Sequence, residues 1–423
     1  MGTYRGTAEA AWRWVLDQVR DDDGVWIPEF PGGDLDARWR EGMYAGIGGL
    51  AHVLAEIRLS REWSPREEEL AEVIAARVRE SIDETSDVTF FNGLVSAISV
   101  LTALGAPGAG EAVARLLELS TPDGWPNDIF VPPRFREGTR THDLTLGTAG
   151  VLLGAVWARR HEVPGAGDLA GIAAEVLVAE REEAPGGLNW RRVPSRFYEA
   201  RSEAPNFSHG LSGIATALAL AGAELGRPDL VEAAGAGAGH LVTLGDTSDG
   251  GFRVSASCPR VPDVEEFSYG WCHGPTGTSL LWPALRRAGV AEVAGTDVDE
   301  WRRRCFHSIR VSGLPERRYP GFWDNDGRCC GTAGVGDVLL DSGQHTDFAL
   351  HLADVVVERA IPDGDGVCWR FVEHRADEPL LPPGIGWMQG AAGIAGFLFH
   401  ADRVERGDAR SVPRVDTWWA LGG

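Results

Sequence analysis

Trp271-Cys272-His273-Gly274-Pro275-Thr276-Gly277 contains a Gly-x-x-Gly pattern that recurs along the chain, and this recurrence predicts the fold. A run of apolar residues follows most copies, and successive copies are 47 to 64 residues apart. One such pair means little in a chain with 55 glycines, but seven copies in near-register indicate a repeated supersecondary unit. The copies are Gly46/Gly49, Gly93/Ser96 (serine in the second position), Gly147/Gly150, Gly210/Gly213, Gly274/Gly277, Gly331/Gly334 and Gly390/Gly393.

The repeat length leaves room for two helices and their loops. Residues after the glycines, such as Ile214 to Leu220, are apolar on all sides, which predicts a buried helix. The segments between copies are amphipathic and charged, as in Arg66 to Ile74, which predicts an outer helix. Alternation of the two predicts an all-α fold, a double-layered (α/α)7 toroid with exposed inner-helix N–H groups at one mouth. An open helical solenoid is the alternative, but the last copy lacks the polar character of a cap.

We expect residues 1–423 to form a single domain, because no linker-like segment interrupts the repeat. Three segments between copies combine a glycine-rich lead, an aromatic residue and an arginine: Leu188 to Val193, Gly251 to Val254 and Val367 to Val372. These are predicted to be short extended segments or hairpins on the rim of the toroid.

Bulk composition excludes several classes of protein. A formal charge of −22 argues against binding to nucleic acid or to anionic membranes. All 40 basic residues are arginine, and the absence of lysine excludes Schiff-base chemistry and a Walker-type phosphate loop. We find no signal peptide in the first 24 residues and no apolar run long enough to span a membrane. Six cysteines are too few for a disulfide scaffold, so a cytoplasmic location is expected.

Three of the cysteines, Cys272, Cys329 and Cys330, lie one or two residues before glycines of the repeat. If the two segments meet, three thiolates form a set that suits Zn²⁺ and leaves the fourth tetrahedral position open for chemistry. The alternative is that these are small buried core residues, as free cysteines often are. The other three cysteines, Cys258, Cys305 and Cys368, lie away from the repeat glycines and are interpreted as ordinary thiols.

The glycine repeat and its cysteines resemble the lanthionine synthetase C-like family over Met43 to His400. The most diagnostic motifs are Trp-Cys-His-Gly-x-x-Gly and Cys-x-Gly-x-x-Gly. The resemblance implies the toroid fold and a zinc site formed by Cys272, Cys329 and Cys330. Cys330 departs from the histidine that is commoner in the family, and a third thiolate makes the zinc site formally −1 instead of neutral.

The resemblance also implies a reaction, the Michaelis-type addition of a cysteine thiolate to dehydroalanine or dehydrobutyrine, which leaves an enolate to be protonated. His209 matches the family's catalytic histidine, and Asp143 matches an aspartate that could orient it. His273 is a second candidate for the proton donor, since histidine suits proton transfer near neutral pH. Each of these residues could instead be a helix cap or an ordinary loop residue.

Members resembling the nisin cyclase have an arginine four residues before the first zinc cysteine, where this chain has Ser268. Arg328, beside Cys329, is one candidate to replace it. A basic cluster could hold an acidic leader peptide, although a solvated outer-helix face is the simpler interpretation. The cluster consists of Arg302, Arg303, Arg304, Arg310, Arg317 and Arg318.

The expected activity is that of a stand-alone lanthipeptide cyclase acting on a dehydrated precursor peptide. We find no dehydratase module in the sequence, so separate dehydratase proteins are the expected partners. Two classes compete with this hypothesis: another toroidal enzyme, such as a glycoside hydrolase or a zinc prenyltransferase, and a noncatalytic relative that binds thiols such as glutathione. Hydrolases of this shape need paired carboxylates, whereas Asp143 is the one carboxylate noted beside the repeat glycines.

Overall fold

The computed structural model describes residues 2–262, 266–316, 325–373 and 377–422. Its regular structure is mainly α-helical, with short two-stranded hairpins between helices, so the predicted all-α class is confirmed. The helices are α1 (Thr3–Asp17), α2 (Leu50–Ser60), α3 (Pro65–Glu80), α4 (Leu94–Leu104), α5 (Ala109–Glu118), α6 (Thr148–Arg160), α7 (Ala166–Ala179), α8 (Leu211–Leu225), α9 (Pro228–Leu244), α10 (Pro275–Thr278), α11 (Leu281–Arg287), α12 (Val298–Val311), α13 (Thr332–Ser342), α14 (Thr346–Glu358) and α15 (Ala391–Glu405).

Within the described residues, six antiparallel strand pairs connect or flank these helices. The three rim segments predicted from sequence contain parts of β4 and β10 and the whole of β6 and β11, so their extended conformation is confirmed. The hairpins are β1 (Arg20–Asp21) with β2 (Val25–Trp26), β3 (Glu182–Ala184) with β4 (Gly187–Asn189), β5 (Gly245–Asp246) with β6 (Arg253–Val254), β7 (Glu292–Val293) with β8 (Thr296–Asp297), β9 (Ile361–Asp363) with β10 (Gly366–Cys368), and β11 (Arg370–Val372) with β12 (Leu380–Pro383).

The helices alternate between two environments, as the sequence pattern predicts. Helix α8 is buried along its first twelve residues, Leu211 to Gly222, because it has apolar or small side chains on every face. Helix α3 buries one stripe and begins with a capping box, in which Ser64 and Glu67 satisfy each other's backbone N–H groups. Charged residues of α3 then remain in water, which is what defines it as an outer helix.

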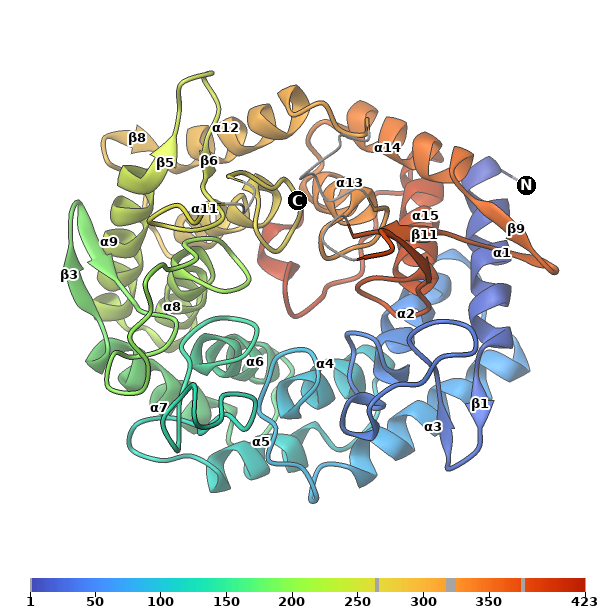
Figure 1. The fold of residues 1–423 in the computed structure, drawn as a ribbon, viewed down its shortest axis with the longest axis horizontal. Helices are drawn as coiled ribbons and strands as arrows, with labels where there is room; N and C mark the ends of the chain where they lie inside the picture. The colour runs from blue at the N-terminus through green and yellow to red at the C-terminus, as the bar shows by residue number, and fades with distance from the viewer. Residues whose placement is uncertain (1, 263–265, 317–324, 374–376, 423) are drawn as a thin grey trace. The chain divides into compact units, whose positions relative to one another are not determined.

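The chain forms two compact units. The first comprises Met1–Glu84, Ser99–Gly108 and Gly313–Gly423, and the second comprises Thr85–Ile98 and Ala109–Ser312. Within the second unit, α8 packs along α9 and α6 along α7, each an inner helix beside an outer one (Figure 1). Within the first unit, α15 packs against α1 and α13 against α14 in the same manner (Figure 1).

Close backbone approach explains the repeat glycines. Gly274 at the start of α10 has extended dihedral angles, φ −130° and ψ 179°, which any residue can adopt. A Cβ atom at Gly277, however, would overlap the carbonyl oxygen of Trp271, and one at Gly334 would overlap that of Arg328. In both cases the blocked carbonyl lies six residues earlier. The loop before each inner helix therefore folds back onto the helix's first turn, and only glycine leaves room for it.

The same folding back satisfies the first N–H groups of the inner helices. The amide of Thr148 donates to the carbonyl of Thr141 at 3.0 Å, and that of Ser212 donates to Pro205 at 3.1 Å. The expectation that these N–H groups are exposed is therefore wrong at α6 and α8. Their loop carbonyls act as the caps that a helix start requires.

Successive loops are joined through one equivalent position, the residue two before the first glycine of each copy. We call this the −2 position. In the second unit the amide of Thr145 donates to the carbonyl of Ser208 at 3.1 Å, and Ser208 donates to Cys272 at 3.0 Å. In the first unit Cys329 donates to Met388 at 2.9 Å, and Met388 donates to Tyr44 at 3.0 Å. Backbone hydrogen bonds thus fix the register of neighbouring loops.

A buried ionic network holds the core of the first unit together. Arg414 lies at its centre and is 2% exposed. Its guanidinium donates to Glu56 at 3.0 Å, approaches Asp337 at 2.8 Å and bonds Asp341. His400 bonds Asp337 at 2.8 Å. These residues come from α2, α13, α15 and the segment after α15, so one set of charges joins four parts of the unit.

Removing the central cation should be costly, because three buried carboxylates would lose their shared partner. We expect Arg414→Met to lower the free energy of unfolding by about 3–5 kcal/mol. The matched control is Arg410→Met, since Arg410 pairs with Asp408 on the surface and its side chain is 63% exposed. Chemical denaturation should place the control within about 0.5 kcal/mol of wild type. Equal effects of the two substitutions would contradict the structural role of the network.

The network also predicts a pH dependence. Burial of Asp341, together with the charges of Asp337 and Glu56, raises the Asp341 pKa to about 6 against the pull of Arg414. A carboxyl group with a raised pKa contributes stability below its unfolded pKa, and this contribution is lost as pH rises through the folded value. Asp341→Asn should therefore gain stability relative to wild type between pH 4 and pH 7, by on the order of 2–3 kcal/mol. Chemical denaturation of both proteins across this pH range tests the prediction. A difference in the free energy of unfolding that does not change with pH would contradict it.

Candidate functional site

His209 and Asp143 form a hydrogen-bonded pair in the second unit. The His209 Nδ1 atom lies 2.6 Å from the Asp143 Oδ2 atom. Asp143 is fully buried, whereas the His209 side chain is 23% exposed. His209 occupies the residue before Gly210, so the folded-back loop of α8 positions it, and Asp143 comes from the equivalent loop of α6. The structure therefore brings together two of the residues that the sequence analysis selected.

Burial acts to raise the pKa of Asp143, but the bond to His209 and the charge of Arg192 outweigh it and hold this pKa below its usual value. The Asp143 Oδ1 atom also accepts a hydrogen bond from the amide of Leu146 at 3.1 Å. Asp143 is consequently an anion with its oxygens already committed. Asp143 can therefore orient the His209 ring by holding its Nδ1 atom, which leaves Nε2 for proton transfer.

Arg192 is a third member of this cluster that the sequence analysis did not identify. Its Nε atom lies 3.2 Å from Asp143 Oδ2, and its side chain is 32% exposed. The backbone on either side is fixed, because the Arg192 carbonyl accepts from His142 and its amide donates to Glu203. Arg192 follows β4 by three residues, within a rim segment interpreted only as extended structure. No spacing in the sequence links that segment to Asp143.

His273 lies beside His209, with ring centroids 5.6 Å apart and planes inclined by 42°. It occupies the same position in its loop as His209 does, the residue before the first repeat glycine. The three histidine and aspartate candidates from the sequence thus converge in the second unit. Their catalytic roles remain predictions, since geometry alone gives proximity.

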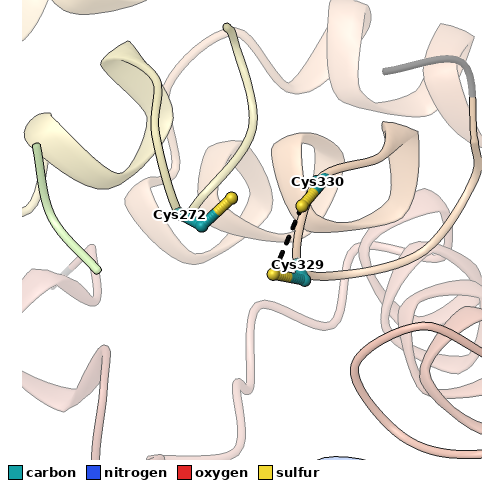
Figure 2. Close-up of side chains that lie close together, drawn as sticks. All are labelled: Cys272, Cys329 and Cys330. Atoms are coloured by element: carbon teal, nitrogen blue, oxygen red, sulfur yellow. Dashed lines mark hydrogen bonds between the residues drawn. The ribbon is translucent and has the colours of Figure 1, made fainter. Parts of the chain in front are cut away.

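Cys272 and Cys329 occupy the −2 positions of their loops, and Cys330 follows Cys329 (Figure 2). The three side chains are buried, at 5% to 7% exposure. Their sulfur atoms form a group in which all lie within 4.8 Å of one another, and the Cys330 and Cys329 sulfurs are 3.3 Å apart (Figure 2). Three soft donors so close together fit Zn²⁺, which prefers thiolate and imidazole ligands.

The remaining cysteines lie in different surroundings. Burial raises the pKa of Cys305 to about 12, and its sulfur accepts a hydrogen bond from the indole of Trp282. Burial also raises the pKa of Cys368 to about 11. Neither belongs to a group of possible metal ligands among the described residues. These two thiols behave as core residues.

A second set of possible ligands, Asp337, Asp341 and His400, belongs to the buried network. Its carboxylates already have a cation between them, because the guanidinium of Arg414 contacts both Asp337 and Asp341. We therefore interpret this set as part of the ionic network and not as a metal centre.

Arg328 is not placed as a substitute for the arginine missing at Ser268. Its guanidinium bonds the buried Asp337 and stacks 4.2 Å from the ring centroid of Trp387. The side chain is therefore directed into the core of the first unit. Its amide and that of Cys329 both donate to the carbonyl of Met388 at 2.9 Å, so Arg328 secures the loop that carries the cysteines.

The arginine cluster on α12 also has its own partners. Arg303 and Arg304 both pair with Glu300 one turn earlier. Arg302 packs against Phe306, with 5.4 Å between the guanidinium and the ring centroid. These contacts favour the outer-helix interpretation over a leader-binding surface. Arg317 and Arg318 lie outside the described residues.

The sequence matches the lanthionine synthetase C-like protein family over residues 38–416. The chain belongs to this family. Its fold is similar to that of the structure described as nisin cyclase, with a TM-score of 0.58 and 14% identity over 95% of this chain and 94% of the other. It is also similar to the Lin0763 protein from Listeria innocua, with a TM-score of 0.52 and 12% identity over 96% and 98% of the two chains. None of the curated proteins matches this chain in sequence.

Family membership confirms the α/α-toroid fold class predicted from the repeat. At 14% and 12% identity, the two similar structures support the fold and nothing finer. Across the described residues, no helix is both long and apolar enough to cross a bilayer. The single-domain prediction and the cytoplasmic location stay predictions.

Proposed function

We propose that this family member is a zinc-dependent lanthipeptide cyclase. The reaction adds the thiol of a peptide cysteine across the double bond of dehydroalanine or dehydrobutyrine and forms a lanthionine or methyllanthionine thioether. The observation that carries the proposal is the three-cysteine group, which offers three soft ligands and leaves a fourth tetrahedral position for a substrate thiol. The family and the fold shared with nisin cyclase support a peptide substrate.

The cysteine group and the His209 cluster divide the chemistry between them. Zn²⁺, when bound by Cys272, Cys329 and Cys330, lowers the pKa of a thiol that joins it. The protein's residues then handle the protons. His209 has its Nδ1 atom held by Asp143, so Nε2 can accept the thiol proton and later return it.

The reaction needs no oxidant and no further reactant. The S–H bond breaks, and a C–S bond forms at Cβ of the dehydro residue as the C=C π bond opens. The electron pair of that π bond passes to Cα as an enolate, and a proton from His209 or His273 completes the product. Both histidines lie on loops fixed by the repeat glycines, which would favour protonation from one face.

The metal can be tested directly. The purified protein should hold about one Zn²⁺ per chain, with three protein sulfurs at about 2.3 Å by X-ray absorption. Cys330→Ala should lose most of the metal because two ligands hold zinc far more weakly than three. Cys368→Ala serves as the control, since this buried thiol lies outside the group. Full zinc content in Cys330→Ala, or fewer than three Zn–S contacts in wild type, would refute the site.

Proton transfer should separate from metal binding on mutation. We expect His209→Asn to keep its zinc and slow cyclisation by about 10²–10⁴-fold, the usual contribution of a positioned acid or base. His351→Asn on α14 is the control, because it lies on the exposed face of an outer helix. The assay follows loss of alkylatable thiol in a dehydrated peptide by mass spectrometry, because cyclisation itself leaves the mass unchanged.

Two outcomes would contradict parts of this proposal. Wild-type protein that binds dehydrated peptide and zinc but never consumes thiols would be a noncatalytic, thiol-binding relative. Wild-type rates in His209→Asn would remove this histidine from the mechanism. Separate dehydratase proteins are proposed as partners, and co-purification with proteins encoded nearby would test that.

A further inference from the structure

The second unit carries a cluster of aromatic and arginine side chains around two loops, residues 126–140 and 194–201. Phe130 packs edge-on against Phe135, with 4.8 Å between ring centroids, and Phe135 lies 4.7 Å from Tyr198. The guanidinium of Arg134 lies 5.3 Å from the Phe135 centroid and 5.9 Å from that of Tyr198. Arg140 lies in the same way 5.6 Å from Phe197. We call these six residues the aromatic–arginine surface.

Its two loops are fixed to each other and to the candidate site. The amide of Arg136 donates to the carbonyl of Phe197, and its side chain donates to the carbonyl of Arg196 at 2.6 Å. Asn127 donates to the carbonyl of Leu146 at 2.8 Å, three residues after Asp143. These bonds tie the first loop to the one that supplies Asp143.

Arg192 makes the surface continuous with the His209 cluster. Its guanidinium lies 5.6 Å from the Phe130 centroid, while its Nε atom lies 3.2 Å from Asp143. A chain of contacts therefore runs from the buried carboxylate, through a partly exposed arginine, to the exposed loop. A peptide whose reacting residue lies at His209 can extend along these side chains.

The two loops expose apolar and cationic side chains. Ile129 and Val131 are 48% and 55% exposed, the latter the highest exposure among the described large hydrophobic residues. The guanidinium groups of Arg134, Arg136 and Arg140 have no carboxylate within ion-pair distance among the described residues, although the chain carries a formal charge of −22. Asp128, Glu137 and Glu199 lie exposed on the same loops, so the cationic character is local to these arginines.

We propose that the aromatic–arginine surface binds an acidic, apolar segment of the peptide substrate and guides the adjoining residues to His209. Carboxylates of the peptide pair with Arg134 and Arg140, while its apolar side chains cover Val131 and the ring of Phe135. The proposal rests on the proposed function for the identity of the peptide as substrate. The α12 arginines are a poorer surface for the same segment because Glu300 already neutralises two of them.

Binding is measured by fluorescence anisotropy with a labelled twelve-residue peptide of alternating Leu or Phe and Asp or Glu. A second probe has Lys in place of each acidic residue. Arg134→Glu should weaken binding of the acidic probe by about tenfold or more, and Val131→Ser by about three- to tenfold. Both residues are exposed, so neither substitution should disturb folding. Raising the salt from 50 to 200 mM should weaken the wild type more than Arg134→Glu.

Arg303→Glu on α12 is the matched control, since it makes the same charge change on an exposed arginine of the same unit. It should bind the acidic probe as wild type does. Unchanged binding in Arg134→Glu and Val131→Ser, an equal loss in Arg303→Glu, or equally tight binding of the Lys probe would each overturn the proposal. So would tighter binding of a single-stranded oligonucleotide that Arg134→Glu abolishes, since that outcome indicates a nucleic-acid partner.

Two further measurements separate this inference from the proposed function. The probe should bind His209→Asn as tightly as wild type, because binding needs no proton transfer. With a dehydrated peptide as substrate, Arg134→Glu should raise KM and leave kcat within about twofold. An inactive wild type that binds the probe refutes the cyclase assignment alone. An active wild type whose binding and KM do not respond to Arg134→Glu refutes the surface alone.

Discussion

The backbone of each loop before an inner helix is held within van der Waals contact of the helix's first turn, and the site depends on this contact. At Gly277 and Gly334 a side chain would collide with the carbonyl six residues earlier. Because the loop lies so close, its carbonyls cap the helix and its amides reach the neighbouring loop. The main-chain geometry therefore places Cys272, Ser208 and Cys329, and the Ser208 hydroxyl adds a contact of 2.9 Å with the hydroxyl of Thr145.

The two parts of the proposed mechanism are supported in different ways. In the second unit, Asp143 is buried and anionic, and its oxygens bond His209, Arg192 and the amide of Leu146. In the first unit, Arg328 links the cysteine loop to Asp337 and so to the charges around Arg414. Buried charges of this kind seldom add stability over an apolar core, but they define one arrangement sharply. The loop that carries Cys329 and Cys330 is anchored to the first unit by this ion pair and by two hydrogen bonds to the carbonyl of Met388.

The sequence was sufficient for features that repeat. Seven copies of the repeat predicted the alternation of buried and amphipathic helices, and α8 and α3 have those environments. His209, His273 and the three cysteines were identifiable because each lies one or two residues before a repeat glycine. The role assigned to the glycines was incomplete, since the N–H groups expected to be exposed at Thr148 and Ser212 are capped by their loops.

Features without a period could not be predicted. Arg192 belongs to a rim segment and contacts Asp143, which lies 49 residues earlier in the chain. Arg328 is directed into the core because it bonds Asp337, nine residues later. Such contacts depend on which long side chains meet in three dimensions. The spacing of charged residues in the sequence does not predict these meetings. The same holds for Phe135 and Tyr198, which pack together although they are more than 60 residues apart in the chain.

The −2 positions have a consequence for how such a protein can change. Thr145, Ser208, Cys272, Cys329 and Met388 take the same place in their repeats, and main-chain hydrogen bonds at these positions set the register of neighbouring loops. The side chain at the −2 position therefore varies among these repeats, while the main-chain bonds between the loops stay the same. A single codon change at Ser208 would place a thiol two residues before Gly210, the position that Cys272 takes before Gly274.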